Sequence, residues 1–236
     1  MNSDDPQVVI HVVAAALIDP ADRVLLAQRP AGRHLAGGWE FPGGKLEPGE
    51  ARLAGLAREL HEEIGITLRM PRPLIRVRHT YPSRDVLLEV WVVRHYRGTP
   101  RGLDGQALRW CTREELATVD LLPADGPIAR VLWLPERLTE VNSRDYEIVE
   151  FDSLGRSGGD RDQGDNGRLR GVFCADASEF DAAIGAGADF LVLRNALADA
   201  ELAKGCDSVH VPIFARGMGL ERAWALGASG LNETSR

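Results

Sequence analysis

The stretch from Gly44 to Ile66, GKLEPGEARLAGLARELHEEIGI, carries the strongest signal for the fold and the chemistry of this chain. Because a helix turns about 100° per residue, Glu62 and Glu63 lie within about 60° of Glu59, and the three carboxylates share one face. An adjacent apolar stripe can dock on a sheet. It consists of Leu53, Leu56, Leu60 and Ile64. The pattern predicts an amphipathic helix from about Glu50 to Ile64.

Three glutamates on one helix face require an explanation, because like charges three or four residues apart repel by roughly 0.2–0.5 kcal/mol per pair. For an isolated E-x-x-E-E pattern, the ordinary explanation is a solvated acidic face. The alternative is a hard divalent cation, since Mg2+ or Mn2+ takes oxygen ligands and keeps several waters for substrate phosphates. Gly43 and Gly44 before the helix favour the cation, because glycine lets the backbone approach a metal or phosphate closely.

The spacing of the whole stretch decides between these explanations. It matches G-x5-E-x7-R-E-U-x-E-E-x-G-U, with U aliphatic, at Gly44, Glu50, Arg58, Glu59, Leu60, Glu62, Glu63, Gly65 and Ile66. This pattern is the Nudix box, and the chain from about Gln7 to Leu134 resembles a Nudix hydrolase domain. The resemblance implies an α/β fold, an α/β/α sandwich with a mixed sheet. It also implies Mg2+-dependent hydrolysis of a nucleoside diphosphate linked to another group, with Mn2+ as a substitute.

The resemblance also implies residue roles. The metal ligands are Glu59, Glu62, Glu63 and the carbonyl of Gly43. Arg58 orients a glutamate through a bidentate pair and Glu50 braces the loop, so the implied catalytic residues are Glu50, Arg58, Glu59, Glu62 and Glu63. A metal-bound water attacks phosphorus while the cations neutralise the developing charge. Gly55, one turn before Glu59, either admits the substrate or is a tolerated helix glycine.

Residues 24–50, VLLAQRPAGRHLAGGWEFPGGKLEPGE, resemble the MutT branch, from a strand through R-x4-H to E-F-P-G-G-K. This match implies that Arg29 contacts the phosphates or the O6 side of a purine, and that His34 lies over the sugar or base. Arg84 aligns with an arginine of the base-closing loop. The implied substrate-binding residues are Arg29, His34, Glu40, Phe41, Lys45, Arg84 and Asp125.

Two positions depart from the MutT pattern. A further metal glutamate of that branch is replaced by Asp104, which is one methylene shorter and still an oxygen ligand. The base-reading asparagine is replaced by Asp125. An ionised Asp125 can accept a hydrogen bond from N7–H of oxidised guanine, but it cannot donate to O6, and it suits the amine of cytosine equally. The stretches Gln106–Cys111 and Pro123–Asp125 also resemble the CTP pyrophosphohydrolase branch.

The leading expectation is therefore hydrolysis of 8-oxo-dGTP to 8-oxo-dGMP and pyrophosphate, which prevents mutagenic misincorporation. Hydrolysis of CTP or of a modified dCTP is the first alternative. A catalytically silent ligand sensor on the same fold is the second.

Outside the box, alternation and turn residues predict further elements. Val8–Ile18 and Val24–Gln28 are expected to form a hairpin, and Leu74–Tyr81 and Val86–His95 two more strands. Asp125–Leu134 is expected to be a second amphipathic helix.

The composition changes at Asp152. Of the 17 residues from Asp152 to Arg168 only Leu154 is apolar. Such a stretch cannot bury enough surface to offset its ordering entropy, which predicts a flexible linker. Strands and helices then alternate with a short period, with one strand expected at Val209–Ala215, and this favours a parallel sheet. We expect a Nudix domain at 1–134, a connecting segment and linker at 135–168, and a βα segment at 169–236.

Leu169–Glu233 resembles the latter part of a thiamine-phosphate synthase barrel, in VFCAD, GADFLVL and PIFARG. A complete (β/α)8 barrel needs roughly 250 residues. The early strands and the acidic pyrophosphate motif have no counterpart, and Met218 replaces the second glycine of the phosphate loop. We expect a partial βα-barrel-like appendage rather than vitamin synthesis. Its open sheet edges would require cover from the Nudix domain or from a second subunit in a homodimer.

Charge and cysteine content exclude other classes of function. The 236 residues carry a formal net charge of -7 and have a pI of about 5.4. This excludes a protein that wraps a nucleic-acid polymer through basic charge, although a nucleotide bound through a metal is allowed. The three cysteines lack metal or disulfide spacing. The acidic N-terminus and the short apolar run predict a cytoplasmic protein without signal peptide or membrane span.

Overall fold

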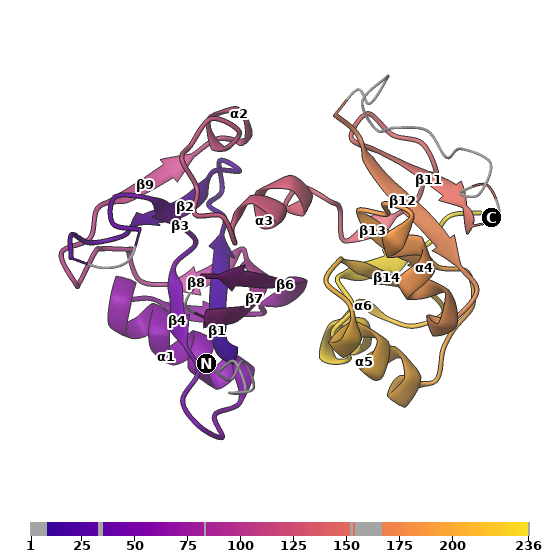
Figure 1. Cartoon of the computed structure of the whole chain (residues 1–236), viewed down its shortest axis with the longest axis horizontal. Helices are drawn as coiled ribbons and strands as arrows, with labels where there is room; N and C mark the ends of the chain where they lie inside the picture. The colour runs from indigo at the N-terminus through magenta and orange to yellow at the C-terminus, as the bar shows by residue number, and fades with distance from the viewer. Residues whose placement is uncertain (1–8, 33–34, 83, 152, 154–166, 236) are drawn as a thin grey trace, which may run out of the picture. The chain divides into compact units, whose positions relative to one another are not determined.

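The computed structural model describes residues 9–32, 35–82, 84–151, 153 and 167–235. The chain forms two compact units, Met1–Leu132 and Trp133–Arg236 (Figure 1). His34 and most of the predicted linker, residues 152 and 154–166, lie outside the described residues. Within the described ranges, no helix is long and apolar enough to cross a membrane.

The N-terminal unit is built on a mixed four-stranded sheet in the order β4-β1-β7-β6. β1 and β7 are parallel and the other pairs are antiparallel, which confirms the mixed sheet expected from the sequence. The strands are β1 (Val9–Leu17), β4 (Gly43–Lys45), β6 (Arg72–Tyr81) and β7 (Arg84–Val93). A second sheet has the order β3-β2-β9, and β5 pairs with β8. These are β2 (Val24–Gln28), β3 (Trp39–Glu40), β5 (Thr67–Arg69), β8 (His95–Arg97) and β9 (Leu108–Cys111).

The hairpin predicted from β1 and β2 is wrong. The two strands share one isolated bridge, between Ile18 and Val24. β1 pairs with β7 along its whole length and with β4 through residues 12–14, so only the residue after its end reaches β2. β2 therefore pairs with β3 and β9 in the other sheet.

Helix α1 (Arg52–Ile64) contains the three glutamates and packs against β1 and β4 (Figure 1). Leu56, Leu60 and Ile64 are fully buried there, as the apolar stripe predicts. Leu53 is 47% exposed, so its predicted place in the stripe is wrong. The buried apolar cluster beneath the helix reaches Leu56 and does not extend to the first turn.

Two shorter helices complete this unit. α2 (Arg113–Leu116) begins with a capping box, in which Thr112 and Glu115 each accept the backbone N–H of the other. α3 (Gly126–Val131) is shorter than the predicted helix and packs against β6.

The C-terminal unit contains a curled, six-stranded, wholly parallel sheet in the order β10-β15-β14-β13-β12-β11. This confirms the parallel sheet expected there. The strands are β10 (Arg137–Leu138), β11 (Tyr146–Glu150), β12 (Leu169–Cys174), β13 (Phe190–Leu193), β14 (Ile213–Ala215) and β15 (Gly230–Asn232). A 3-10 turn, η2 (Ala177–Glu179), precedes α4 (Phe180–Gly185), and α5 (Asp199–Ser208) and α6 (Leu220–Ala225) follow.

Several features of this unit differ from the expectations. β10 and β11 lie within the stretch expected to be only a connecting segment, and β14 begins at Ile213 rather than at Val209. Beside β11, the N–H of Ile148 donates to the carbonyl of Val141 at 2.7 Å, and the N–H of Ser143 donates to the carbonyl of Tyr146 at 2.8 Å. The chain therefore covers part of the β11 edge itself, and the expected homodimer stays a prediction.

Candidate active site

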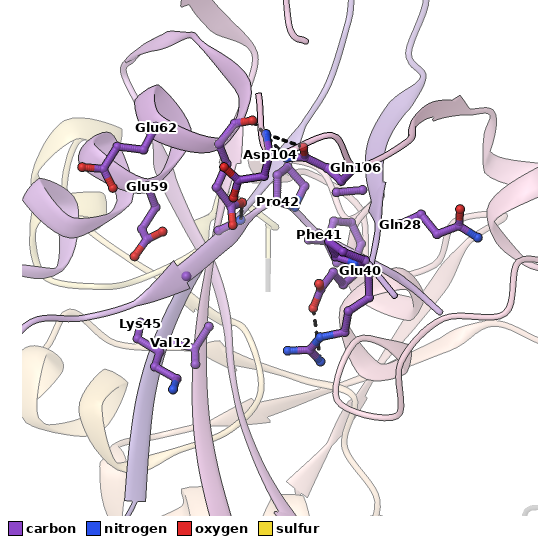
Figure 2. A pocket seen from close by; sticks show the side chains of 16 residues that line it. Val12, Gln28, Glu40, Phe41, Pro42, Lys45, Glu59, Glu62, Asp104 and Gln106 are labelled. Atoms are coloured by element: carbon purple, nitrogen blue, oxygen red, sulfur yellow. Dashed lines mark hydrogen bonds and ion pairs between the residues drawn. The ribbon is translucent and has the colours of Figure 1, made fainter. Parts of the chain in front are cut away.

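A cavity of about 430 Å³ opens in the N-terminal unit between α1, the β3–β4 segment and the loop after β8. In Figure 2, Glu59 and Glu62 lie on one side of it, and Glu40 and Phe41 lie across from them. The predicted site residues that line it are Arg29, Glu40, Phe41, Gly43, Lys45, Glu59, Glu62, Glu63 and Asp104. Predicted site residues from β3, β4, α1 and the loop after β8 thus lie around one cavity.

Arg58 holds the carboxylates of the helix in place. Its Nε and Nη2 donate to the two oxygens of Glu50 at 2.9 and 2.8 Å, which is a bidentate pair. Its Nη1 donates to Glu59 at 2.9 Å and to Glu62 at 3.2 Å. Glu50 also accepts the N–H of Glu47 at 3.0 Å, and these bonds lower the pKa of Glu50 to about 2. Arg58 therefore links the loop before α1 to two glutamates on the helix.

The two glycines before α1 are needed where they stand. A Cβ on Gly44 would lie 2.2 Å from Oε2 of Glu59, so the carboxylate rests directly against the backbone. Gly43 has a φ of +153°, and a Cβ there would lie 2.1 Å from the carbonyl oxygen of Val13. Its N–H donates to Oε2 of Glu63 at 3.3 Å. Only glycine allows these close approaches.

Gly55 has a different role from either one expected. It is buried, and a Cβ there would lie 2.4 Å from Cδ2 of Leu46 and 2.8 Å from Oε2 of Glu50. Gly55 therefore allows the loop between β4 and α1 to pack against the helix.

Glu63 is the most perturbed carboxyl of the helix. Burial raises its pKa to about 7, and the negative charge of Glu59 contributes further. The loop after β8 is anchored nearby, because Nε2 of Gln106 donates to the carbonyl of Glu63 at 3.0 Å. Oε1 of Gln106 accepts the N–H of Asp104 at 3.0 Å, which fixes Asp104 at the cavity.

The donor set fits a hard divalent cation. Within the described residues, no three His, Cys, Asp or Glu side chains are already arranged around an ion position, and Glu59 and Glu62 instead bind Arg58. Carboxylates are nevertheless the ligands that Mg2+ and Mn2+ prefer. Besides Glu40 on the opposite side, four of them line the cavity, and the raised pKa of Glu63 reflects burial and the crowding of these charges. They are Glu59, Glu62, Glu63 and Asp104.

Asp125 lies behind Phe41 and does not line the cavity. It is 4% exposed, and its Oδ1 accepts the N–H of Phe41 at 3.3 Å. Burial raises the pKa of Asp125 to about 8, and the charge of Glu40 adds to the increase. At neutral pH this carboxyl is therefore mostly protonated.

Arg29 lies at the same end of the cavity. Its Nη1 is 3.6 Å from Oε2 of Glu40. Its Nε is buried and has no hydrogen-bond partner among the described residues, so it can donate to a bound molecule. Arg84 lines no part of the cavity.

Sequence reasoning missed three residues near this site. Gln28 and Gln106 line the cavity, and Nε2 of Gln28 donates to the carbonyl of Gly37 at 2.9 Å. Tyr81 lies near Asp125, whose charge, together with burial, raises the pKa of the Tyr81 phenol. The sequence signal for the two glutamines was their place beside predicted site residues. Gln28 precedes Arg29, and Gln106 follows the loop of Asp104.

The fold and the cavity define a class of protein, a mixed α/β domain with a cluster of carboxylates lining one cavity. The profile of the NUDIX domain matches residues 13–130, half of the chain, and the chain belongs to the Nudix hydrolase family. As a Nudix hydrolase, the enzyme acts on phosphoric anhydrides of nucleotides. The family generally uses divalent metals.

Curated relatives resemble this half of the chain. The CTP pyrophosphohydrolase of Escherichia coli is 41% identical over 116 residues, which cover 49% of this chain and 86% of that protein. The 8-oxo-dGTP diphosphatase of the same organism is 31% identical over 119 residues, 50% of this chain and 92% of that protein. A solved MutT NUDIX hydrolase from Burkholderia pseudomallei is 27% identical, with a TM-score of 0.49, covering 55% of this chain and 100% of that one. The family match ends at residue 130, so the thiamine-phosphate-synthase resemblance of the C-terminal unit stays a prediction.

Proposed function

We propose that this enzyme hydrolyses 8-oxo-dGTP to 8-oxo-dGMP and pyrophosphate with Mg2+. The observation that carries this proposal is the burial of Asp125 against the backbone of Phe41, which raises the pKa of this carboxyl to about 8 and favours its neutral form. A neutral carboxyl offers an O–H donor beside a C=O acceptor. Oxidised guanine offers the acceptor O6 beside the donor N7–H, whereas guanine offers two acceptors. Where the base reaches Asp125 beside Phe41, a neutral carboxyl forms two hydrogen bonds with oxidised guanine, and one of them is lost with guanine.

The sequence predicts an ionised Asp125 that cannot donate, whereas burial favours the neutral form, which can. Oδ1 of Asp125 already accepts the N–H of Phe41, and a carbonyl oxygen has a second lone pair for N7–H. The buried Nε of Arg29 supplies a further donor, for a phosphate oxygen or a base carbonyl.

The carboxylates of the cavity would act on the phosphates through the cation. Glu59, Glu62, Glu63, Asp104 and the carbonyl of Gly43 would hold the cation. When bound, Mg2+ acidifies water and neutralises charge that develops at phosphorus.

The other predicted contacts complete this proposal. Arg58 and Glu50 position Glu59 and Glu62 through the bonds described above. Lys45, exposed on β4 at the cavity wall, attracts the phosphates by its charge.

Hydrolysis of CTP or of a modified dCTP is the second candidate function. Cytosine presents the donor N4–H beside the acceptor N3, and a neutral Asp125 matches that pair as well. The 41% identity to a CTP pyrophosphohydrolase favours this candidate.

A competitive panel of 8-oxo-dGTP, dGTP, CTP and 5-methyl-dCTP, assayed for pyrophosphate release with Mg2+, tests the proposal. We expect the highest kcat/KM for 8-oxo-dGTP, and at least about tenfold less for dGTP, since a lost hydrogen bond costs about 1.4 kcal/mol. Glu62→Gln should abolish turnover, and Glu114→Gln, on the exposed side of α2, is the matched control. Preference for either cytidine nucleotide would establish the second candidate instead. Binding without turnover of any nucleotide would indicate a sensor.

A further inference from the structure

The loop after β8 docks on the carboxyl end of α1. The last carbonyls of a helix have no partner within it, so they can accept hydrogen bonds from a neighbouring loop. The N–H of Arg101 donates to the carbonyl of Ile64 at 3.1 Å. The N–H of Leu103 donates to the carbonyl of Glu63 at 2.9 Å. The backbone of this loop is therefore tied to the last turn of α1.

The side chain of Gln106 adds a bridge between two residues of the proposed cation site. Its Nε2 donates to the carbonyl of Glu63 at 3.0 Å, and its Oε1 accepts the N–H of Asp104 at 3.0 Å. Figure 2 shows Gln106 and Asp104 side by side at the cavity, joined by the second of these bonds. One amide thus uses both its donor and its acceptor, and each bond ends on the backbone of a carboxylate residue.

The loop closes tightly around this amide. A Cβ on Gly102 would lie 2.1 Å from the carbonyl oxygen of Gln106 and 2.9 Å from its Oε1. A side chain at position 102 would therefore push the amide of Gln106 away from its two partners. The amide stays between Glu63 and Asp104 because glycine leaves the space open.

Asp104 needs such an anchor if it binds the cation. It lies on an exposed part of the loop, and it lines the same cavity as the glutamates of α1. Mg2+ demands oxygen ligands at about 2.0–2.1 Å in near-octahedral geometry, so a ligand on an exposed loop contributes little unless its backbone is held in place. Groups that orient metal ligands typically change metal affinity about 10–100-fold when they are lost.

We propose that Gln106 is a positioning residue for the cation, whose amide holds Asp104 at a fixed place relative to the glutamates of α1. This inference rests on the cation site of the proposed function. It adds to that site a side chain that acts through Asp104 rather than on the metal.

Isothermal titration of the full chain with MgCl2, without nucleotide, tests this role. Gln106→Met keeps the length of the side chain and removes both hydrogen bonds, so we expect it to weaken Mg2+ binding at least about tenfold. Asp104→Asn should weaken binding as well. Because Gln106 acts through Asp104, the double variant Asp104→Asn/Gln106→Met should bind Mg2+ no more weakly than Asp104→Asn alone. A parallel titration with MnCl2 repeats the comparison with a second ion.

Two further variants separate this role from a general loss of structure. In Gly102→Ala the new Cβ displaces the amide while Gln106 itself is kept, and we expect Mg2+ binding to weaken here too. Gln28→Met is the matched control. Gln28 lines the same cavity, but its Nε2 donates to the carbonyl of Gly37, so its loss should leave the Mg2+ affinity unchanged. Circular dichroism melting shows that each variant is folded.

The outcomes distinguish this inference from the proposed function. Equal Mg2+ affinities of the wild type, Gln106→Met and Gly102→Ala would overturn the inference and leave the proposed function standing. The inference also fails if Gln106→Met weakens binding as much in the Asp104→Asn background as in the wild type, since Gln106 then acts on another group. A wild type that binds neither Mg2+ nor Mn2+ would overturn the cation site itself, and both proposals with it.

Discussion

Raising the pH should remove the selectivity that Asp125 provides. Burial places the pKa of this carboxyl at about 8, against an ordinary value of 3.8. Above its pKa, the neutral fraction falls about tenfold for each pH unit. We therefore expect the kcat/KM for 8-oxo-dGTP to fall roughly fivefold between pH 8 and pH 9, because an ionised Asp125 cannot donate to O6.

The variant Asp125→Asn is the matched control, since its amide donates and accepts at every pH. Pyrophosphate release is measured for both proteins at pH 7, 8 and 9, and the wild-type kcat/KM is divided by that of Asp125→Asn. This ratio cancels the effect of other groups that titrate, among them Glu63 with its pKa of about 7. The ratio should be flat near pH 7 and fall above pH 8. A ratio that stays constant to pH 9 would refute the role given to a neutral Asp125.

Folding stability provides a separate measurement of the same group. A carboxyl whose pKa is raised in the folded state binds more protons there than when unfolded, so stability falls as pH rises between the two pKa values. For Asp125 that window runs from about 4 to about 8, with a slope of about 1.4 kcal/mol per pH unit. In urea titrations, the difference in unfolding free energy between wild type and Asp125→Asn should follow this slope, and a difference independent of pH would contradict it.

Three further predictions concern α1 and the cation. Gly44→Ala should lower the Mg2+ affinity and kcat at least about tenfold, because the added Cβ displaces Glu59. Gly126→Ala, which has open space around it, should leave both quantities unchanged. Isothermal titration measures the affinity, and steady-state kinetics measures kcat. Leu60→Ala should lower the free energy of unfolding by about 2–5 kcal/mol, because Leu60 is buried. Leu53→Ala should lower it by less than about 0.5 kcal/mol, because Leu53 is exposed. Equal losses of the two variants in urea melts would contradict this difference in burial. EDTA should abolish pyrophosphate release and added Mg2+ should restore it; activity that survives chelation would contradict the metal requirement.

The sequence predicts α1 well because its signals are local. The spacing of Leu56, Leu60 and Ile64 specifies which face is buried, and Gly65, in the left-handed conformation, ends the helix as expected. Leu53 has the same spacing and is exposed, because burial depends on what lies beneath each turn.

Strand pairing and protonation are not local, so the sequence predicts them less well. Val24–Gln28 follows β1 closely, and nothing in either stretch reveals that β1 is paired on both edges by strands far along the chain. The ionisation of Asp125 depends on burial behind Phe41, 84 residues away in the sequence. β11 did have a weak signal, since Tyr146, Ile148 and Val149 are residues that favour strands, but the polar residues around them concealed it.

The hydrogen bonds from Arg58 to Glu59 and Glu62 have a consequence for the metal-free enzyme. The guanidinium offsets the mutual repulsion of these acidic groups before any ion arrives. We therefore expect α1 to form, and the domain to stay folded, without a bound cation.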